Sequence, residues 1–314
     1  MQVSFVIPLY NCLPLTQAMV ASLQASLPPG LAHEIILVDD GSTDGTREWL
    51  ATLRPPFQVI LHERNLGYAA ATNRGAALAC GEYLALLNND LLLAPGWLEP
   101  MLAAHRHLGP RAGLVGNIQR QVRTGTVDHC GLQLSLRGKL EHRRTGPGPL
   151  ARWLAPVRPV GAVTGACVLL DRATWQELGG FDEGYVNGGE DVDLCLRALD
   201  AGRVNAVALR SVVLHHVSAS PGRKARDEEN SHRFTRRWRT HLWRLVDRRW
   251  CRQYLWVHAF GSRPPGRQAV TLSVLLYVLH LRRTPPPEVF VALTAAVDFQ
   301  LARWDAMFAP GRDS

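Results

Sequence analysis

Carboxylate and amide side chains follow two apolar runs of the sequence. Asp39 and Asp40 come directly after EIILV, and Asn88, Asn89 and Asp90 come directly after EYLALL. In an open α/β sheet, ligands bind at the carboxyl ends of the strands. A carboxylate there can hold Mg²⁺ or Mn²⁺ while the phosphates of a substrate supply further oxygen ligands. We therefore expect Asp90 at a diphosphate and metal site, and Asp39 or Asp40 accepting hydrogen bonds from a base or a ribose.

Two further segments are candidates for the same ligand. ERNLGYAAATNRG places Asn65, Gly67 and Asn73 around a short helix of small residues, which permits close approach of a ligand. Tight helix packing explains the alanines of this segment equally well, but not both asparagines. After the first apolar run, Pro8 closes a strand and Tyr10 could lie against a flat base, although such turns are common.

Glu190 and Asp191 begin an amphipathic helix after a glycine pair. The helix N-terminus keeps a carboxylate ionised, and an ionised carboxylate can take a proton from an attacking hydroxyl. His215 and His216 follow the run VVL, where a neutral imidazole could complete the coordination of a metal-bound diphosphate. Each of these features also has a structural interpretation, because carboxylates cap helices and lone buried histidines are usually structural.

Consecutive βαβ units must position these side chains, because apolar β-branched runs alternate with helical patterns over the first 120 residues. The patterns predict strands at 3–7, 34–38, 58–61, 82–87 and 113–118 and helices at 15–27, 46–53, 69–79 and 97–107. Residues 141–159 are rich in Pro, Gly and Arg and are predicted to form a loop or lid outside the sheet. A strand, VGAVTGACVLLD, and a helix ending at Gly179 follow.

The length and composition of the chain indicate its domain content and its location in the cell. The 314 residues suffice for one large α/β domain and an appendage, and the six cysteines form no CxxC pair. A cytoplasmic location is therefore expected, with the first residues forming a strand rather than a signal peptide. The apolar runs at 269–279 and 289–297 are shorter than the roughly 20 residues that span a bilayer.

A basic, mostly helical extension is expected from about residue 221 to 314, after a domain covering 1–220. Residues 222–252 contain 11 Lys and Arg against 4 acidic residues. Phe234, Trp238, Leu242, Leu245 and Trp250 recur on roughly one side of this segment. We expect it to dock at the inner face of the cell membrane. Packing against the domain or in a homo-oligomer interface is the alternative.

Taken in order, SFVIPLYN, EIILVDDGSTDGT, NLGYAAATNRG, LLNND, TGACVLLDRATWQELGGFDE, GGEDVDLCLRALDAG and HHVSAS resemble the inverting family-2 glycosyltransferases of the GT-A fold. The resemblance covers about residues 3–220. It implies a mostly parallel, Rossmann-like α/β sheet flanked by helices. It also implies transfer of a sugar from a nucleoside diphosphate sugar to a hydroxyl of a glycan, a lipid-linked acceptor or a protein.

The resemblance also assigns roles to residues. Asp191, with Glu190, matches the catalytic base, and Asp90 with His215 or His216 matches the metal and diphosphate ligands for Mg²⁺ or Mn²⁺. The donor-binding residues that it implies are Pro8, Tyr10, Asp39, Asp40, Ser42, Asn65, Gly67, Asn73, Asn88, Asn89, Gly165 and Ala166.

This sequence departs from the family pattern at two positions. Asn88 stands where the metal motif usually has Asp, and Thr72 stands where many relatives carry Arg, so metal dependence could be weaker than in relatives. These features look like the branch that contains rhamnosyltransferases of cell-surface polysaccharides, which often use thymidine diphosphate sugars. The alternatives are a non-catalytic nucleotide-sugar binder and a nucleic-acid-binding protein whose basic tail carries interleaved tryptophans. We expect no nucleic acid as partner.

Overall fold

The computed structural model describes residues 2–216, 226–260, 268–282 and 285–309. The chain forms two compact units, each of which is described by itself. The first comprises Met1–Gly131 and His142–Asp227, and the second comprises Leu132–Glu141 and Glu228–Ser314. Ser220, near the expected domain boundary, lies outside the described residues.

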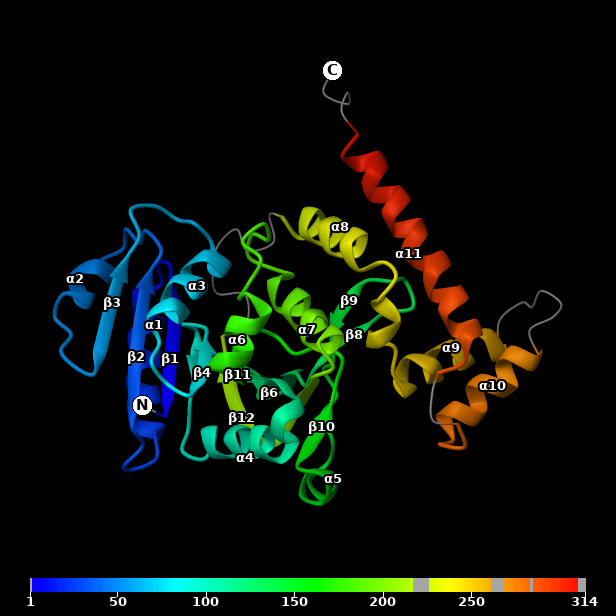
Figure 1. Ribbon diagram of the computed structural model, residues 1–314, viewed down its shortest axis with the longest axis horizontal. Helices are drawn as coiled ribbons and strands as arrows, with labels where there is room; N and C mark the ends of the chain where they lie inside the picture. The colour runs from blue at the N-terminus through cyan, green and yellow to red at the C-terminus, as the bar shows by residue number, and fades with distance from the viewer. Residues whose placement is uncertain (1, 217–225, 261–267, 283–284, 310–314) are drawn as a thin grey trace. The chain divides into compact units, whose positions relative to one another are not determined.

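In its described part, the first unit is built on a ten-stranded sheet of order β10-β12-β6-β11-β4-β1-β2-β3, with β5 added to β12 and β7 to β6. The strands are β1 (Val3–Leu9), β2 (His33–Asp39), β3 (Phe57–Leu61), β4 (Tyr83–Leu87), β5 (Leu91–Leu92), β6 (Ala112–Gln121), β7 (Val127–His129), β10 (Val157–Pro159), β11 (Cys167–Asp171) and β12 (Val204–His215). The four strands β3, β2, β1 and β4 run parallel and stand side by side in the blue and cyan part of Figure 1.

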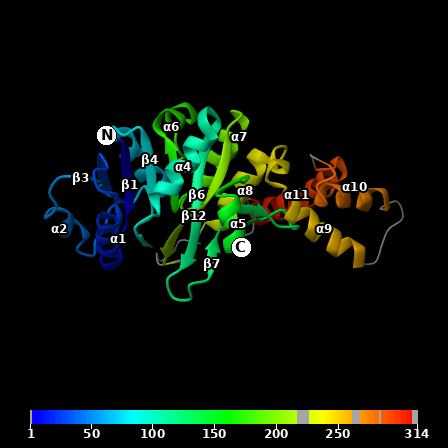
Figure 2. The ribbon, with the colours of Figure 1, turned by 90° about the horizontal axis from the view of Figure 1, so that it is seen from below.

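The remaining pairings are mixed. Strand β11 lies antiparallel between β4 and β6, and β12 runs parallel to β6, beside which it is also seen in Figure 2. The helices are α1 (Leu13–Ser26), α2 (Thr46–Leu50), α3 (Tyr68–Leu78), α4 (Leu98–Leu108), α5 (Pro149–Leu154), α6 (Arg172–Leu178) and α7 (Glu190–Asp200), with a 3₁₀ turn η1 (Gly109–Arg111). This arrangement confirms the expected α/β architecture.

The two faces of the parallel strands are covered by different helices, because successive strand residues point to opposite sides. Phe5 and Ile7 belong to one buried apolar cluster with Met19 of α1 and Met101 of α4. On the opposite face, α3 comes so close to the sheet that a glycine, Gly75, is required in it. A Cβ at this position would lie 2.6 Å from Cγ1 of Val6 and 2.9 Å from Cγ2 of Val38.

Gly75→Ala is therefore expected to destabilise the fold. The added methyl group has no space between two branched side chains, and overpacking of this kind costs about 1–3 kcal/mol. Urea denaturation measures the loss of unfolding free energy. Ala77→Ser, on the exposed side of the same helix, serves as the control and should change stability little. Equal stability of Gly75→Ala and the wild type would show that α3 does not pack in this way.

Two expectations about the middle of the chain are wrong. Residues 141–159 do not lie wholly outside the sheet, because β10 joins its edge by pairing antiparallel with β12. A strand can form here despite Pro159 because β10 lies at the edge of the sheet, where the missing N–H of proline is tolerated. The strand predicted from VGAVTGACVLLD is shorter than expected, since only β11 is extended, and the preceding residues turn at Gly161 and Gly165 toward the carboxyl end of β4.

Asp171 fixes the start of α6. Its Oδ1 accepts from the backbone N–H of Thr174 at 2.6 Å, and its Oδ2 lies 3.2 Å from Nε2 of His105. Burial acts to raise the pKa of Asp171, but the hydrogen bonds from His105 and Thr174 outweigh it and hold that pKa well below the ordinary value. A depressed pKa means that the ionised carboxylate stabilises the folded state.

Asp171→Ala is expected to lower the free energy of unfolding by about 1–2 kcal/mol at neutral pH, because the helix loses its cap. The contribution of the charge is present above about pH 4, the ordinary pKa of Asp, and is lost as the pH falls through the depressed pKa of the folded state. The difference between Asp171→Ala and the wild type should therefore shrink in acid. Denaturation at several pH values, with Asp171→Asn as a variant that keeps a cap acceptor, checks this expectation.

The second unit consists of a short β-hairpin and a set of helices. Its elements are β8 (Leu132–Leu134), β9 (Leu140–His142), α8 (Asp227–Trp238), a 3₁₀ turn η2 (Leu242–Leu245), α9 (Arg248–Phe260), α10 (Gln268–Val278) and α11 (Pro287–Met307). Glu228 joins its segments, because it accepts from Lys139 of the hairpin at 3.3 Å and from Arg303 and Trp304 of α11. The indole of Trp250 donates to the carbonyl of Ser135 at 3.3 Å.

The apolar side that the sequence predicts in the basic extension is buried in the structure. Phe234, Trp238, Leu242, Leu245 and Trp250 are all less than 9 % exposed. The nucleic-acid alternative rested on Trp238, Trp243 and Trp250. The indoles of Trp238 and Trp250 are buried and have no open face for base stacking, whereas Trp243 is 44 % exposed. The five buried side chains are likewise withdrawn from any membrane surface.

Candidate active site

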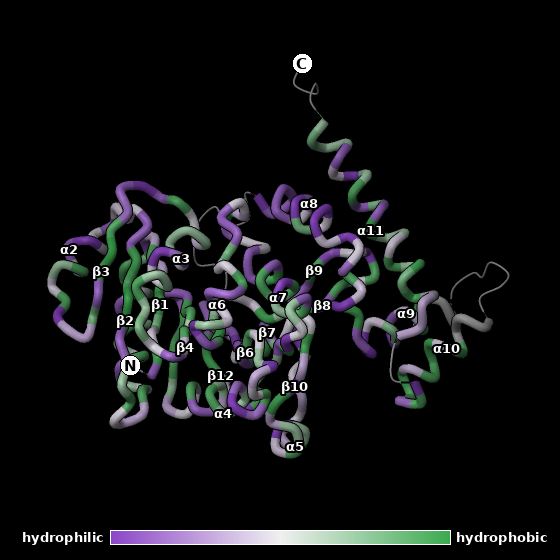
Figure 3. Tube along the Cα trace, viewed as in Figure 1, coloured by the Kyte–Doolittle hydropathy of each residue, from purple (hydrophilic) through white to green (hydrophobic). Residues whose placement is uncertain are grey.

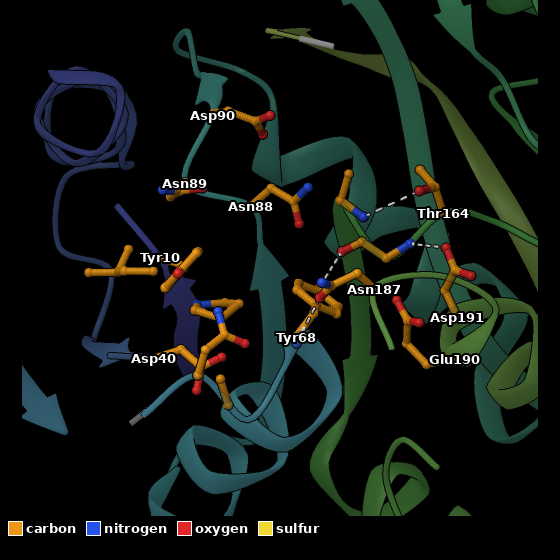
Figure 4. A pocket seen from close by; sticks show the side chains of 16 residues that line it. Tyr10, Asp40, Tyr68, Asn88, Asn89, Asp90, Thr164, Asn187, Glu190 and Asp191 are labelled. Atoms are coloured by element: carbon orange, nitrogen blue, oxygen red, sulfur yellow. Dashed lines mark hydrogen bonds between the residues drawn. The ribbon is translucent and has the colours of Figure 1, made fainter. Parts of the chain in front are cut away.

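A pocket opens where the parallel strands end. It is lined by Pro8, Leu9, Tyr10, Asp40, Asn65, Tyr68, Ala71, Asn88, Asn89, Asp90, Thr164, Gly165, Ala166, Asn187, Glu190 and Asp191. These residues come from the ends of β1, β2 and β4, from the start of α3, and from the segments before β11 and at the start of α7. Figure 4 shows Asp40, Asp90 and Asp191 around this one cavity. The structure thus brings together three carboxylates that lie far apart in the sequence.

Asp40 ties the end of β2 to the segment before α3. Its Oδ1 accepts from the backbone N–H of Leu66 at 2.9 Å and contacts Nδ1 of His62 at 2.8 Å, while its Oδ2 accepts from the N–H of Gly67 at 2.8 Å. Because each carboxylate oxygen has two lone pairs, Oδ2 can still accept a hydrogen bond from a ligand. Asp40 lies below the exposed ring of Tyr10 in Figure 4.

The neighbouring carboxylate, Asp39, does not line the pocket. It is fully buried, and it accepts from the backbone N–H of Ser42 and from Nε of Arg47 at 2.8 Å. The two aspartates differ because successive side chains at the end of a strand point to opposite sides. Asp39 and Ser42 therefore shape the turn after β2, and Asp40 is the one that faces the cavity.

Asp90 and His215 form a pair beside the pocket. Nε2 of His215 lies 3.2 Å from Oδ1 of Asp90, and both side chains are nearly inaccessible to solvent. Among the described residues, Oδ1 of Asp90 and both ring nitrogens of His215 find no hydrogen-bond partner. Buried polar atoms without partners are costly, so this pair suits a ligand that accepts lone pairs from both atoms. His216 contributes its backbone N–H, which donates to the carbonyl of Asp90 at 2.9 Å.

A divalent cation fits this pair. A carboxylate oxygen and a neutral imidazole nitrogen are both ordinary ligands of Mn²⁺ and Mg²⁺ sites, and they stand close enough to share one ion. No group of three or more His, Cys, Asp or Glu that could hold a metal occurs in the described part of the chain. The protein therefore offers part of a coordination shell, which a substrate with phosphate oxygens would have to complete.

The two asparagines before Asp90 have different surroundings. The backbone N–H of Asn88 donates to the carbonyl of Ala166 at 2.8 Å, so the end of β4 is tied to the segment before β11. The side chain of Asn89 donates to Oγ1 of Thr16 at 2.9 Å, although the residue also lines the pocket. The side chain of Asn88 stands in the cavity between Asp90 and Tyr68 in Figure 4.

Asp191 lies in the first turn of α7, on the opposite side of the pocket from Tyr10. Its Oδ2 accepts from the backbone N–H of Gly165 at 2.8 Å, and its Oδ1 accepts from the N–H of Val192 at 2.8 Å. Both bonds fix the orientation of the carboxylate at the start of the helix. One lone pair remains on each oxygen, so Asp191 can accept a proton from a hydroxyl in the cavity. Glu190, its neighbour in α7, is buried and also lines the pocket.

Tyr68 and Asn187, which are not among the predicted site residues, also line the pocket. The hydroxyl of Tyr68 donates to the carbonyl of Gly165 at 2.8 Å, and the backbone N–H of Tyr68 donates to Oδ1 of Asn187 at 3.2 Å. Together with Asp191, Tyr68 thus holds Gly165 at both its N–H and its carbonyl. A signal for Tyr68 was available, since it is the first residue of a helix that follows a strand end.

His129 contacts the backbone of Thr164, the residue before Gly165. Its Nε2 accepts from the N–H of Gly131 at 3.1 Å and faces the N–H of Thr164 at 3.4 Å. Burial and the neighbouring His142 lower the pKa of His129 well below its ordinary value, so the imidazole is neutral and can accept these bonds. No pattern in the sequence indicated this role.

Several predicted donor residues lie outside the pocket lining. Gly67 begins α3 and gives its N–H to Asp40. Asn73 donates to the carbonyl of Phe181 at 3.0 Å and to Glu183, and it accepts from the N–H of Phe181. This asparagine therefore joins α3 to the segment after α6. The residues that do line the pocket as expected are Pro8, Tyr10, Asp40, Asn65, Asn88, Asn89, Asp90, Gly165, Ala166, Glu190 and Asp191.

Comparison with known proteins agrees with this geometry. A model of the family described as "Glycosyl transferase family 2" matches residues 4–149. An N-acetylglucosaminyl-diphospho-decaprenol L-rhamnosyltransferase of Mycobacterium tuberculosis is 32% identical over 237 residues, covering 68% of this chain and 76% of that protein. An uncharacterized protein of Sinorhizobium fredii, y4gI, is 31% identical over 255 residues, which cover 76% of this chain but 28% of that protein.

Two solved structures share the fold. The crystal structure of GalNAc-T7 with UDP, GalNAc and Mn²⁺ has a TM-score of 0.58 at 19% identity and covers 74% of this chain and 50% of that one. The mannosyltransferase PcManGT from Pyrobaculum calidifontis, in complex with GDP-Man and Mn²⁺, has a TM-score of 0.51 at 18% identity and covers 99% and 76%. The sheet and these neighbours define the GT-A fold, and the family model and the mycobacterial relative identify the class as glycosyltransferase. The chain belongs to glycosyl transferase family 2.

Proposed function

We propose that this glycosyltransferase transfers a sugar from a nucleoside diphosphate sugar to a hydroxyl group, with inversion at the anomeric carbon. The observation that carries the proposal is the position of Asp191, which lines the same pocket as Asp90, the residue that His215 contacts from beside the pocket. A base on one side of the sugar and a diphosphate site on the other suit a direct displacement. The attacking oxygen and the leaving oxygen then lie on opposite faces of the anomeric carbon.

The nucleoside would occupy the side of the pocket formed by Tyr10 and Asp40. The exposed ring of Tyr10 can lie against a base, and the free lone pairs of Asp40 can accept from a base N–H or a ribose hydroxyl. Asp90 and His215 would hold a divalent cation at the diphosphate. Such a cation acts as a Lewis acid that stabilises the negative charge developing on the leaving nucleoside diphosphate.

Asp191 would then take the proton of the acceptor hydroxyl. Its two backbone hydrogen bonds fix the orientation of the carboxylate, so that the remaining lone pairs point to a defined place in the cavity. Tyr68 and His129 position Gly165 and Thr164, which form the floor on which the sugar would rest. Positioning of this kind supplies a large part of the rate enhancement when one reactant must meet another.

We also propose which donor and which acceptor the enzyme uses. The name of the mycobacterial relative supports a rhamnosyl donor and a lipid-linked sugar acceptor. Thymidine diphosphate rhamnose is the first such donor to test. A role in the synthesis of cell-surface polysaccharide or another glycoconjugate follows from that choice. Uridine diphosphate sugars are the second group of donors.

A thermal-shift screen of nucleotide sugars, with and without Mn²⁺, tests the proposal. The correct donor should raise the melting temperature in the presence of Mn²⁺ and much less in EDTA, because a ligand that binds the folded state stabilises it. Donor turnover with a hydroxyl acceptor, followed by NMR of the product anomer, then distinguishes a transferase from a silent binder. Retention of configuration would overturn the assignment of Asp191 as the base for a direct displacement.

A further inference from the structure

Helix α10 of the second unit carries a row of leucines on its solvent side. Leu272, Leu275, Leu276 and Leu279 follow one another at the i, i+3, i+4, i+7 spacing of a single helix face, and each is between 37 and 58 % exposed. The other side of α10 is apolar as well, since Val274 and Tyr277 are buried. Figure 3 accordingly colours α10 largely in the green of hydrophobic residues. A helix that is apolar all round is normally covered on every side.

The preceding helix also carries an exposed aromatic side chain. Helix α9 packs against α10. The guanidinium group of Arg248 in α9 lies over the ring of Tyr277 in α10, 4.8 Å from its centroid. Trp256 of α9 is 71 % exposed, and Leu281, just after α10, is similarly exposed. We call Trp256, Leu272, Leu275, Leu276 and Leu279 the leucine face. An apolar surface of this kind on a protein in water marks a site of interaction.

The segment of the chain that carries the leucine face is basic. Residues 248–282 contain six arginines and no Asp or Glu. Two of the arginines, Arg263 and Arg267, lie outside the described residues, and Arg252 is exposed on α9. Such a surface suits an anionic partner. A symmetric contact with a second copy of the chain would instead bring these arginines toward one another without carboxylates of the same segment to neutralise them.

We propose that the α9–α10 hairpin docks the protein on an anionic lipid bilayer, with the leucine face among the acyl chains and the arginines at the headgroups. Tryptophan, leucine and arginine are the residues that place a helix in the plane of a membrane interface. Within the described residues, no helix is both long and apolar enough to cross a membrane. The basic helix α8, whose apolar side is buried, is thus not the docking element. This inference goes beyond the proposed transfer reaction and does not depend on it.

Co-sedimentation of the full chain with vesicles tests the proposal without any donor or acceptor. Wild-type protein should bind vesicles of phosphatidylcholine with phosphatidylglycerol, and binding to phosphatidylcholine alone should be weaker. The double substitution Leu275→Gln, Leu279→Gln should weaken the partition coefficient at least about tenfold, because two apolar side chains no longer enter the acyl region. Both substitutions are on the surface, and circular dichroism checks that the variant keeps the helix content of the wild type.

Leu61→Gln, Leu78→Gln is the matched control. These two leucines of the first unit are about as exposed as those of α10, so the double variant changes surface hydrophobicity equally and should bind vesicles like the wild type. A second variant, Arg249→Gln, Arg252→Gln, should lose about fivefold or more on anionic vesicles and little on neutral ones, since each basic residue near such a surface contributes to binding.

Several outcomes would overturn the proposal. Wild-type protein that does not bind anionic vesicles, or a Leu275→Gln, Leu279→Gln variant that binds as well as the wild type, would do so. A dimer in light scattering that dissociates on the same substitutions, without vesicle binding, would assign the leucine face to a second copy instead. Failure of the transfer reaction would leave these vesicle results unchanged, so the two proposals are tested separately.

Discussion

Asp191→Asn is expected to reduce turnover by about 10²–10⁴-fold, the range that a positioned general base contributes. Asparagine has nearly the shape of aspartate, but it cannot take a proton from the acceptor hydroxyl. The binding of nucleoside diphosphate should change little, because Asp191 lies across the pocket from Tyr10 and Asp90 (Figure 4). Steady-state kinetics with saturating acceptor and calorimetric titration with the nucleotide measure the two effects.

The same chemical change at the far end of α7, Asp200→Asn, is the control and should leave turnover near the wild-type value. An Asp191→Asn enzyme with full activity would refute the assignment of the base. A variant that loses nucleotide binding together with turnover would show instead that the hydrogen bond to Gly165 supports the donor site.

Asp90→Ala is expected to abolish the effect of Mn²⁺ on nucleotide binding and to slow turnover by about 10²-fold or more. A cation at a leaving diphosphate contributes several kcal/mol of charge stabilisation, and each 1.4 kcal/mol is a factor of ten in rate. His215→Ala should act in the same direction, because Oδ1 of Asp90 and Nε2 of His215 stand 3.2 Å apart and neither atom has a hydrogen-bond partner among the described residues. Titrations of the nucleotide in Mn²⁺ and in EDTA separate the cation's contribution from direct contacts.

Asn89→Ala tests whether the loss is specific to the proposed ligand. Asn89 precedes Asp90 and lines the same pocket, but its side chain donates to Thr16, so its removal should leave the Mn²⁺ dependence intact. Equal Mn²⁺ dependence in Asp90→Ala and the wild type would show that the cation binds elsewhere.

Much of the fold and part of the candidate site could be predicted from the sequence because the relevant signals are local. Apolar runs identify buried strands, and the strand-end rule places Asp40 and Asp90 at one edge of the sheet. The glycine pair before Asp191 marks the start of α7 in the same way. These signals require no knowledge of which segments pack against each other.

The remaining features depend on tertiary contacts that have no periodic signal. Whether Asp39 or Asp40 faces the cavity depends on where β2 ends, and a shift of one residue reverses the answer. His129 and Tyr68 reach Thr164 and Gly165 from segments that are distant in the chain. The edge strand β10 could not be recognised from its sequence, VRP, because a short strand at a sheet edge needs little apolar surface and shows no apolar run.

The most direct test of the account is a crystal structure of the protein with a nucleoside diphosphate and Mn²⁺. We predict anomalous density for one Mn²⁺ bound by Oδ1 of Asp90 and a ring nitrogen of His215 at about 2.0–2.3 Å. The diphosphate should complete the coordination, with the base beside Tyr10 and the carboxylate of Asp191 facing the position of the sugar. Density for the ion and the nucleotide outside this pocket, or a nucleotide whose phosphates point away from Asp90, would contradict the account.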